Sequence, residues 1–215
     1  MPETAPPTIT VTGTGRVGVR PDLADLRLGV TSTEASVEAA RAAAARALTE
    51  VLARLRGLGI AERDLQTSIV AVNPQYDYSR EGKAPRLAGY TITNLVSAVI
   101  RDIDRVGAAI DAALAAGATS VDRIAFRVAD PSAAEAEART AAVADARAKA
   151  DILAAAAGLS IAGVAAILEP GGAIPFPAQF PEMARMAATN DASTPVEPGT
   201  NEVTASVTIA YRLSG

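Results

Sequence analysis

Three glycines near the N-terminus, Gly13, Gly15 and Gly18, form a GxGxxG pattern directly after a predicted strand. In dinucleotide-binding proteins such glycines bring backbone N–H groups at a helix N-terminus close to a pyrophosphate. Here no apolar helical stripe begins until Val37, and the residues in between continue an extended pattern. Without the helix the phosphate site is not built. We therefore interpret the glycines as part of a bent or bulged strand in which glycine permits positive φ.

The densest cluster of polar and aromatic side chains is Tyr76, Asp77 and Tyr78. In one interpretation Asp77 is an acid or a ligand group beside two phenols. In the other, a strand ends here and the tyrosine hydroxyls face water. No carboxylate that would form an acid–base pair with Asp77 is evident beside it. We favour the strand end and keep these three residues as a candidate interaction or pocket site.

Lys149 is one of few lysines in the chain. A Schiff-base lysine needs an apolar environment that lowers its pKa. Lys149 instead lies four residues after Asp145 on a charged helix, which is the spacing of a surface ion pair. Asp145 with Glu135 or Glu137 offers oxygen ligands to a metal, but carboxylates this sparse are typical of a solvated helix face. We expect no metal, cofactor-binding or catalytic residues.

The composition excludes several kinds of chemistry. The chain has no His and no Cys, so disulfides, thiolate nucleophiles, Ser-His-Asp triads and zinc sites built from Cys and His are absent. The net charge is −4 and the isoelectric point is near 5.0, which argues against a nucleic-acid binder. No run of eighteen apolar residues predicts a transmembrane helix.

The 215 residues are 49% hydrophobic, which is enough for a sizeable core. Alternating residues predict strands, and apolar residues at three- and four-residue steps predict helices. The resulting order is ββαββαβαββ, an α+β fold with a mixed or antiparallel sheet and about three helices on one face. We expect the first two strands to form a hairpin. The predicted strands are 8–19, 23–30, 65–72, 89–101, 121–128, 163–168 and 202–213, and the helices are 36–57, 103–116 and 131–157.

Residues 1–7 read as a disordered tail, and residues 8–215 as one domain in which the last strand returns to the main sheet. Residues 170–200 are rich in proline and show no period, so we expect a long loop. This loop contains Phe176, Phe180, Met183 and Met186, which predict either a partner-binding patch or a loosely packed flap.

Four phrases resemble the SIMPL domain family (DUF541), in the family's order. They are ITVTGTGRVGVRPDLADLRLGV, AERDLQTSIVAVNPQYDY, AVADARAKADILAAAAGL and TPVEPGTNEVTASVTIAYRL, and the resemblance runs from about Thr8 to Leu213. It implies a bacterial protein that is exported to the periplasm or cell envelope. Some members resemble large ring-shaped homo-oligomers, and some are described as envelope immunogens or linked to oxidative stress. No catalytic residues are established in the family.

Three functions stay open. The first is a non-enzymatic envelope protein that assembles into a homo-oligomer, with a role linked to stress. The second is a ligand-binding or enzymatic pocket at Tyr76, Asp77 and Tyr78. The third is an intracellular signalling adaptor, since a vertebrate relative that names the family interacts with a signalling kinase. No signal peptide is visible. We expect a periplasmic or secreted protein whose native signal peptide has been removed, or a cytoplasmic one if Met1 is the native start.

Overall fold

The computed structural model describes residues 7–79, 84–171, 174–177 and 194–215. By their contacts the residues divide into two compact units. Of the described residues, we call 7–21, 128–171, 174–177 and 199–215 the terminal unit, and 22–79, 84–127 and 194–198 the central unit. The predicted single domain over residues 8–215 stays a prediction, because compactness does not decide whether the units unfold together.

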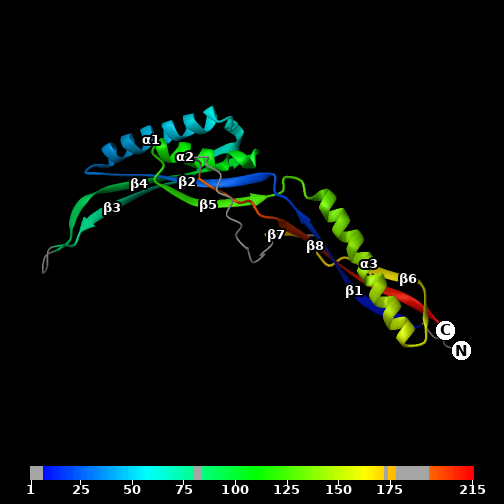
Figure 1. Cartoon of the computed structure of the whole chain (residues 1–215). Coiled ribbons are helices and arrows are strands. Elements are labelled where there is room, and N and C mark those ends of the chain that lie inside the picture. The colour runs from blue at the N-terminus through cyan, green and yellow to red at the C-terminus, as the bar shows by residue number, and fades with distance from the viewer. Residues whose placement is uncertain (1–6, 80–83, 172–173, 178–193) are drawn as a thin grey trace. The chain divides into compact units, whose positions relative to one another are not determined.

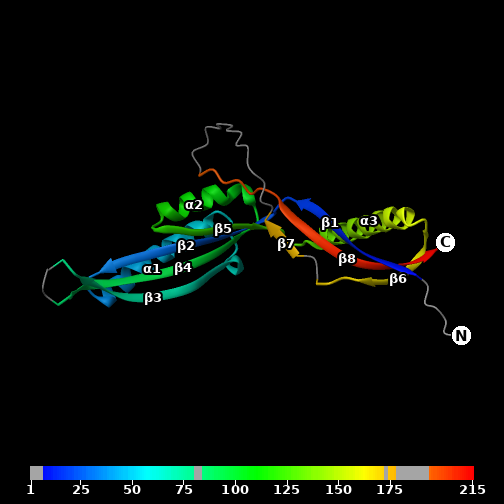
Figure 2. The same ribbon diagram turned by 90° about the horizontal axis from the view of Figure 1, so that it is seen from below.

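The terminal unit is an antiparallel sheet with one helix on a face (Figure 2). Strand β8 (Asn201–Ser214) lies in the middle, with β1 (Thr8–Val19) on one side. On its other side β8 pairs with β6 (Ser160–Leu168) and, further along, with the short β7 (Ile174–Pro177). Every second residue of β8 from Asn201 to Tyr211 is buried, as the alternation in the sequence predicts.

The helix of this unit, α3 (Ser132–Ala156), packs on the sheet, and its buried residues are all alanines. The buried stripe recurs every four residues at Ala138, Ala142, Ala146, Ala150 and Ala154. Small side chains on the helix let its backbone approach the sheet closely, and the strand beneath needs small residues too.

Gly13 and Gly15 meet that need on β1. A Cβ atom on Gly13 would lie 2.0 Å from the carbonyl oxygen of Ala142, and one on Gly15 would lie 2.0 Å from that of Ala138. The expected bulge with positive φ is wrong. Among the described residues, the glycines with positive φ are all elsewhere in the chain, and β1 pairs with β8 without a register shift. Gly13 and Gly15 of the GxGxxG pattern are therefore explained by the close approach of the β1 backbone to the α3 backbone.

The central unit is a second antiparallel sheet, in the order β3 (Leu65–Asp77), β4 (Arg86–Ile100), β2 (Leu23–Glu34) and β5 (Ser120–Arg127). Figure 1 shows α1 (Val37–Gly57) and α2 (Val106–Ala115) on one face. The core between them contains Leu26, Leu28, Val51, Leu55 and Ile110. Ser36 caps α1, since its hydroxyl accepts the Ala39 N–H at 3.2 Å. Short 3₁₀ turns, Glu62–Asp64 and Ile103–Arg105, precede β3 and α2.

The α+β class and the predicted element order are confirmed. The structure divides the strands between two sheets, with α1 and α2 on one and α3 on the other. The expected hairpin of the first two strands is wrong, because β1 pairs with β8 whereas β2 pairs with β4 and β5. The expected loop over 170–200 is wrong at residues 174–177, which form β7. Residues 1–6 of the expected tail lie outside the described residues.

Candidate functional site

Tyr76, Asp77 and Tyr78 lie at the exposed end of β3, as the strand-end interpretation expects. The two tyrosine rings are 6.5 Å apart and tilted. The Asp77 carboxylate accepts the backbone N–H of Ser79 at 2.8 Å. Hydrogen bonds from the Ser79 side chain and backbone, together with the charge of Arg86, lower the pKa of Asp77. An anionic carboxylate that closes a turn is poorly suited to act as a general acid.

Of the residues predicted in the long loop, Phe176 lies in β7 opposite Glu202. Phe180, Met183 and Met186 lie outside the described residues. The choice between a partner-binding patch and a flap therefore stays a prediction.

Lys149 forms the expected ion pair with Asp145, at 2.7 Å. Its Nζ also donates to the carbonyl oxygen of Thr12 at 3.0 Å, and Asp145 accepts the backbone N–H of Thr14 at 2.8 Å. The hydrogen bond from Lys149, then that from Thr14, lowers the pKa of Asp145. Since β1 is the outermost strand of its sheet, this pair covers backbone groups that would otherwise be open to another strand.

Strand β3, at the edge of the central sheet, carries exposed apolar side chains instead. Val70 and Val72 are 66% and 50% exposed. They lie opposite Asn94 and Ile92 of β4, and Ile92 packs against α1 through Ala40 and Ala44. Directly opposite residues share a face of the sheet. The two valines therefore lie on the helix-covered face, at an edge that α1 does not cover.

Strand β6 resembles β3 in this respect. It is the outer neighbour of β8 in the terminal unit, and Val164, Ile167 and Leu168 along it are exposed. Ile167 is 60% exposed. In the described part of each unit, an edge strand thus carries apolar side chains that face solvent.

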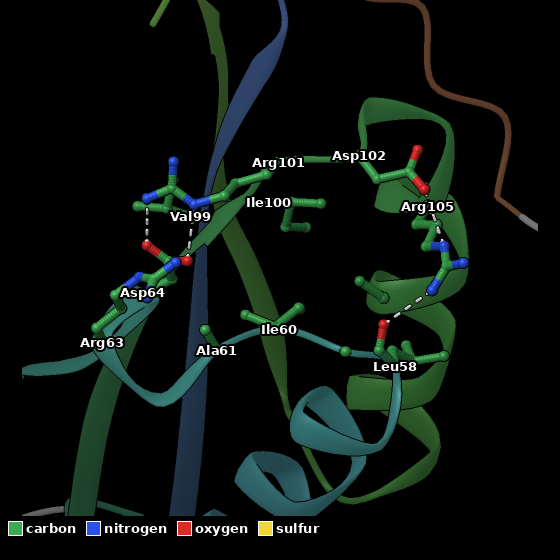
Figure 3. A pocket seen from close by; sticks show the side chains of 12 residues that line it. Leu58, Ile60, Ala61, Arg63, Asp64, Val99, Ile100, Arg101, Asp102 and Arg105 are labelled. Atoms are coloured by element: carbon green, nitrogen blue, oxygen red, sulfur yellow. Dashed lines mark hydrogen bonds and ion pairs between the residues drawn. The ribbon is translucent and has the colours of Figure 1, made fainter.

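A pocket of about 280 Å³ opens in the central unit where the chain passes from α1 to β3 and from β4 to α2 (Figure 3). On one side Arg101 donates two hydrogen bonds to Asp64, from Nε at 2.9 Å and from Nη2 at 2.8 Å. On the other side Arg105 pairs with Asp102 at 2.9 Å and donates to the carbonyl oxygen of Leu58 at 3.1 Å. Two ion pairs therefore face each other across the pocket.

The Asp64 carboxylate is buried, with only 7% of its side chain exposed, and remains charged. The hydrogen bond from Arg101 lowers the pKa of Asp64 and outweighs the effect of burial, and the charge of Arg63 lowers it further. The same bond raises the pKa of Arg101. A bidentate pair of this kind holds both side chains in one geometry.

This pocket was not predicted from the sequence. Asp102, directly before the predicted helix 103–116, makes no side-chain capping bond there and pairs with Arg105. The signal that the sequence offered for this pocket was the presence of charged residues directly before the predicted strand 65–72 and the predicted helix 103–116. Only the fold shows that they meet across 37 positions of sequence.

The described part of the chain offers no group of three or more carboxylates that could hold a metal ion. Among the helices of that part, none is long and apolar enough to cross a bilayer.

The family model of SIMPL, described as a protein of unknown function (DUF541), matches residues 9–211. Two relatives, from Brucella melitensis biotype 1 and Brucella abortus strain S19, are each named 26 kDa periplasmic immunogenic protein. Each is 34% identical to the chain over 217 residues, which span 98% of this chain and 86% of the relative. The uncharacterized protein YggE of Escherichia coli K12 is 30% identical over 137 residues, which span 64% of this chain and 55% of YggE.

Proposed function

Because this chain belongs to the SIMPL family, whose members are of unknown function, we propose that it is a non-enzymatic protein of the bacterial cell envelope that assembles with further copies of itself. The name of the Brucella relatives supports the compartment, since they match almost the whole chain and are called periplasmic. Fractionation of cells that express the full gene tests this, and recovery of the protein in the cytoplasm would contradict it.

The observation that carries self-assembly is the contrast between edge strands. On β1, Lys149 and Asp145 bond to two backbone groups at the outer edge, the carbonyl oxygen of Thr12 and the N–H of Thr14. The edge of β3 instead exposes Val70 and Val72 on the helix-covered face. Natural proteins that stay monomeric protect such edges, often with an edge lysine. An unprotected apolar edge favours pairing with another strand.

A second copy of this chain is the occupant that we propose for these edges. A neighbour's strand would pair with the backbone of β3 or β6, and its adjoining elements would cover the exposed side chains. Each Val that becomes fully buried contributes up to about 1.5 kcal/mol before ordering costs. Two open edges in each chain allow a closed symmetric assembly.

The chemistry of the candidate residues supports a non-enzymatic role. Asp77 closes a turn and its pKa is lowered, whereas general acids at neutral pH have raised pKa values. Lys149 forms an exposed ion pair rather than lying in an apolar site. A role in the oxidative stress response, which the family resemblance implies, is part of the same proposal.

Light scattering after size-exclusion chromatography tests the assembly. The wild-type chain should have a mass well above 21.8 kDa at micromolar concentration. The double variant Val70→Lys/Val72→Lys should reduce that mass, because lysines on an edge oppose strand addition. The matched control is Ile152→Lys on α3, at a residue that is 69% exposed but lies on a helix, and its mass should not change. A monomeric wild-type chain would overturn the proposal.

A further inference from the structure

The pocket of the central unit has a charged lining that the proposed self-assembly does not explain. Its rim carries three guanidinium groups, Arg63, Arg101 and Arg105, and two carboxylates, Asp64 and Asp102. The lining therefore has a net charge of one positive unit. Each carboxylate is already engaged by one arginine, Asp64 by Arg101 and Asp102 by Arg105.

Of the three arginines that line the pocket, Arg63 is the one that pairs with neither of these two carboxylates. Among the residues that the structure describes it makes neither a hydrogen bond nor an ion pair, although its charge lowers the pKa of the neighbouring Asp64. Figure 3 shows Arg63 beside the Asp64–Arg101 pair, at the side of the pocket opposite Arg105. A guanidinium in this place is free to bind an oxyanion through its fork of N–H donors.

The rest of the lining is apolar and compact. Ile60, Ala61 and Ile100 lie between the two ion pairs (Figure 3). The volume of about 280 Å³ lies just below the usual range of about 300–1,000 Å³ for ligand pockets, so only a small molecule fits.

We propose that this pocket binds a small monocarboxylate with a compact apolar body. The carboxylate would bind to Arg63, and the apolar body would lie against Ile60 and Ile100. One excess positive charge matches one negative charge, and the apolar floor favours a carbon skeleton over an inorganic ion. The pocket lies within one unit, so this inference does not depend on the proposed self-assembly.

Benzoate is the probe, because it is a small monocarboxylate with one negative charge and a compact apolar ring. Titration of the full-length chain, followed by NMR of its backbone amides, should give saturable shifts that centre on residues 58–64 and 99–105. We expect a dissociation constant on the order of 1 mM for a ligand this small. Benzamide, which is neutral and of the same size, should bind at least about tenfold more weakly. Inorganic phosphate should cause no saturable shift at these residues.

Arg63→Gln tests the residue assignment, since it removes the charge but none of the hydrogen bonds between Asp64 and Arg101. It should weaken benzoate binding about tenfold and leave the thermal stability nearly unchanged. Arg27→Gln is the matched control. Arg27 also lacks an ion pair among the described residues but lines a different pocket, so its removal should have no effect.

Ala61→Leu tests the shape of the site, because added volume should displace the apolar body and abolish the shifts. The proposal is overturned if benzoate and benzamide bind equally, or if phosphate binds in place of benzoate. It is also overturned if Arg63→Gln binds benzoate as the wild type does, or if no saturable shift appears up to about 20 mM.

Discussion

At the scale of single residues, the pair of Asp64 and Arg101 has the clearest energetic role. Asp64 is buried and accepts two hydrogen bonds from one guanidinium. We predict that Asp64→Asn lowers the free energy of unfolding by about 1–3 kcal/mol at pH 7, because Arg101 loses a charged partner. Urea denaturation measures the difference. Asp102→Asn is the control, since both partners of that pair are exposed and the loss should stay below about 1 kcal/mol.

The pH dependence of this difference follows from the pKa of Asp64. Its pKa in the folded protein lies below its ordinary value, which is about 3.9 in an unfolded chain. The stabilisation is therefore fully present above pH 4–5, and is lost as the pH falls through the folded pKa. The difference between wild type and Asp64→Asn should shrink as the pH falls from about 4–5 through the folded pKa. A constant difference would show that the ionised carboxylate is not the cause.

At the scale of elements, the contact between α3 and β1 depends on glycine. We predict that Gly13→Ala or Gly15→Ala lowers the stability by about 3 kcal/mol or more, since the new Cβ would meet a backbone carbonyl rather than a flexible side chain. Thermal or urea unfolding measures this. Gly18→Ala on the same strand should cost much less, because its nearest atom is a Thr200 methyl group at 3.3 Å.

Gly57 at the end of α1 is the second control. No atom lies within 4 Å of its added Cβ, and alanine is the better helix former. Gly57→Ala should therefore stabilise the chain by up to about 1 kcal/mol. If Gly13→Ala were as well tolerated, the close packing of the alanine stripe would not be what requires glycine.

At the scale of the whole molecule, the proposed assembly predicts which segment matters. Deletion of residues 76–86 removes the end of the β3–β4 hairpin and should lower the mass measured by light scattering. Deletion of residues 176–186 should leave the mass mostly unchanged, because ordering the rest of the loop predicted over residues 170–200 would cost more free energy than burial of Phe176, Phe180, Met183 and Met186 returns. The opposite result would assign the interface to that loop.

The local patterns of the sequence determined the type and order of the elements. Alternation along β8 marks its buried face, and the apolar period of α1 marks the side that packs on β2 and β4. The spacing of Asp145 and Lys149 predicted an ion pair within one helix, and the structure confirms it. The lack of His and Cys is likewise a property of composition. The strand alternation, the helix period and the ion pair concern residues within a few turns of one another, where local geometry decides the contact.

The tertiary structure alone decided how distant segments combine. Alternation shows which face of a strand is buried but not which strand lies beside it, so β1 was wrongly paired with β2 rather than β8. The glycines of β1 owe their role to a helix about 130 positions further along the chain. The Asp64–Arg101 pair joins two segments 37 positions apart, and the pocket beside it exists only where those segments meet. Such contacts depend on chain topology, because packing brings together residues that no local period relates.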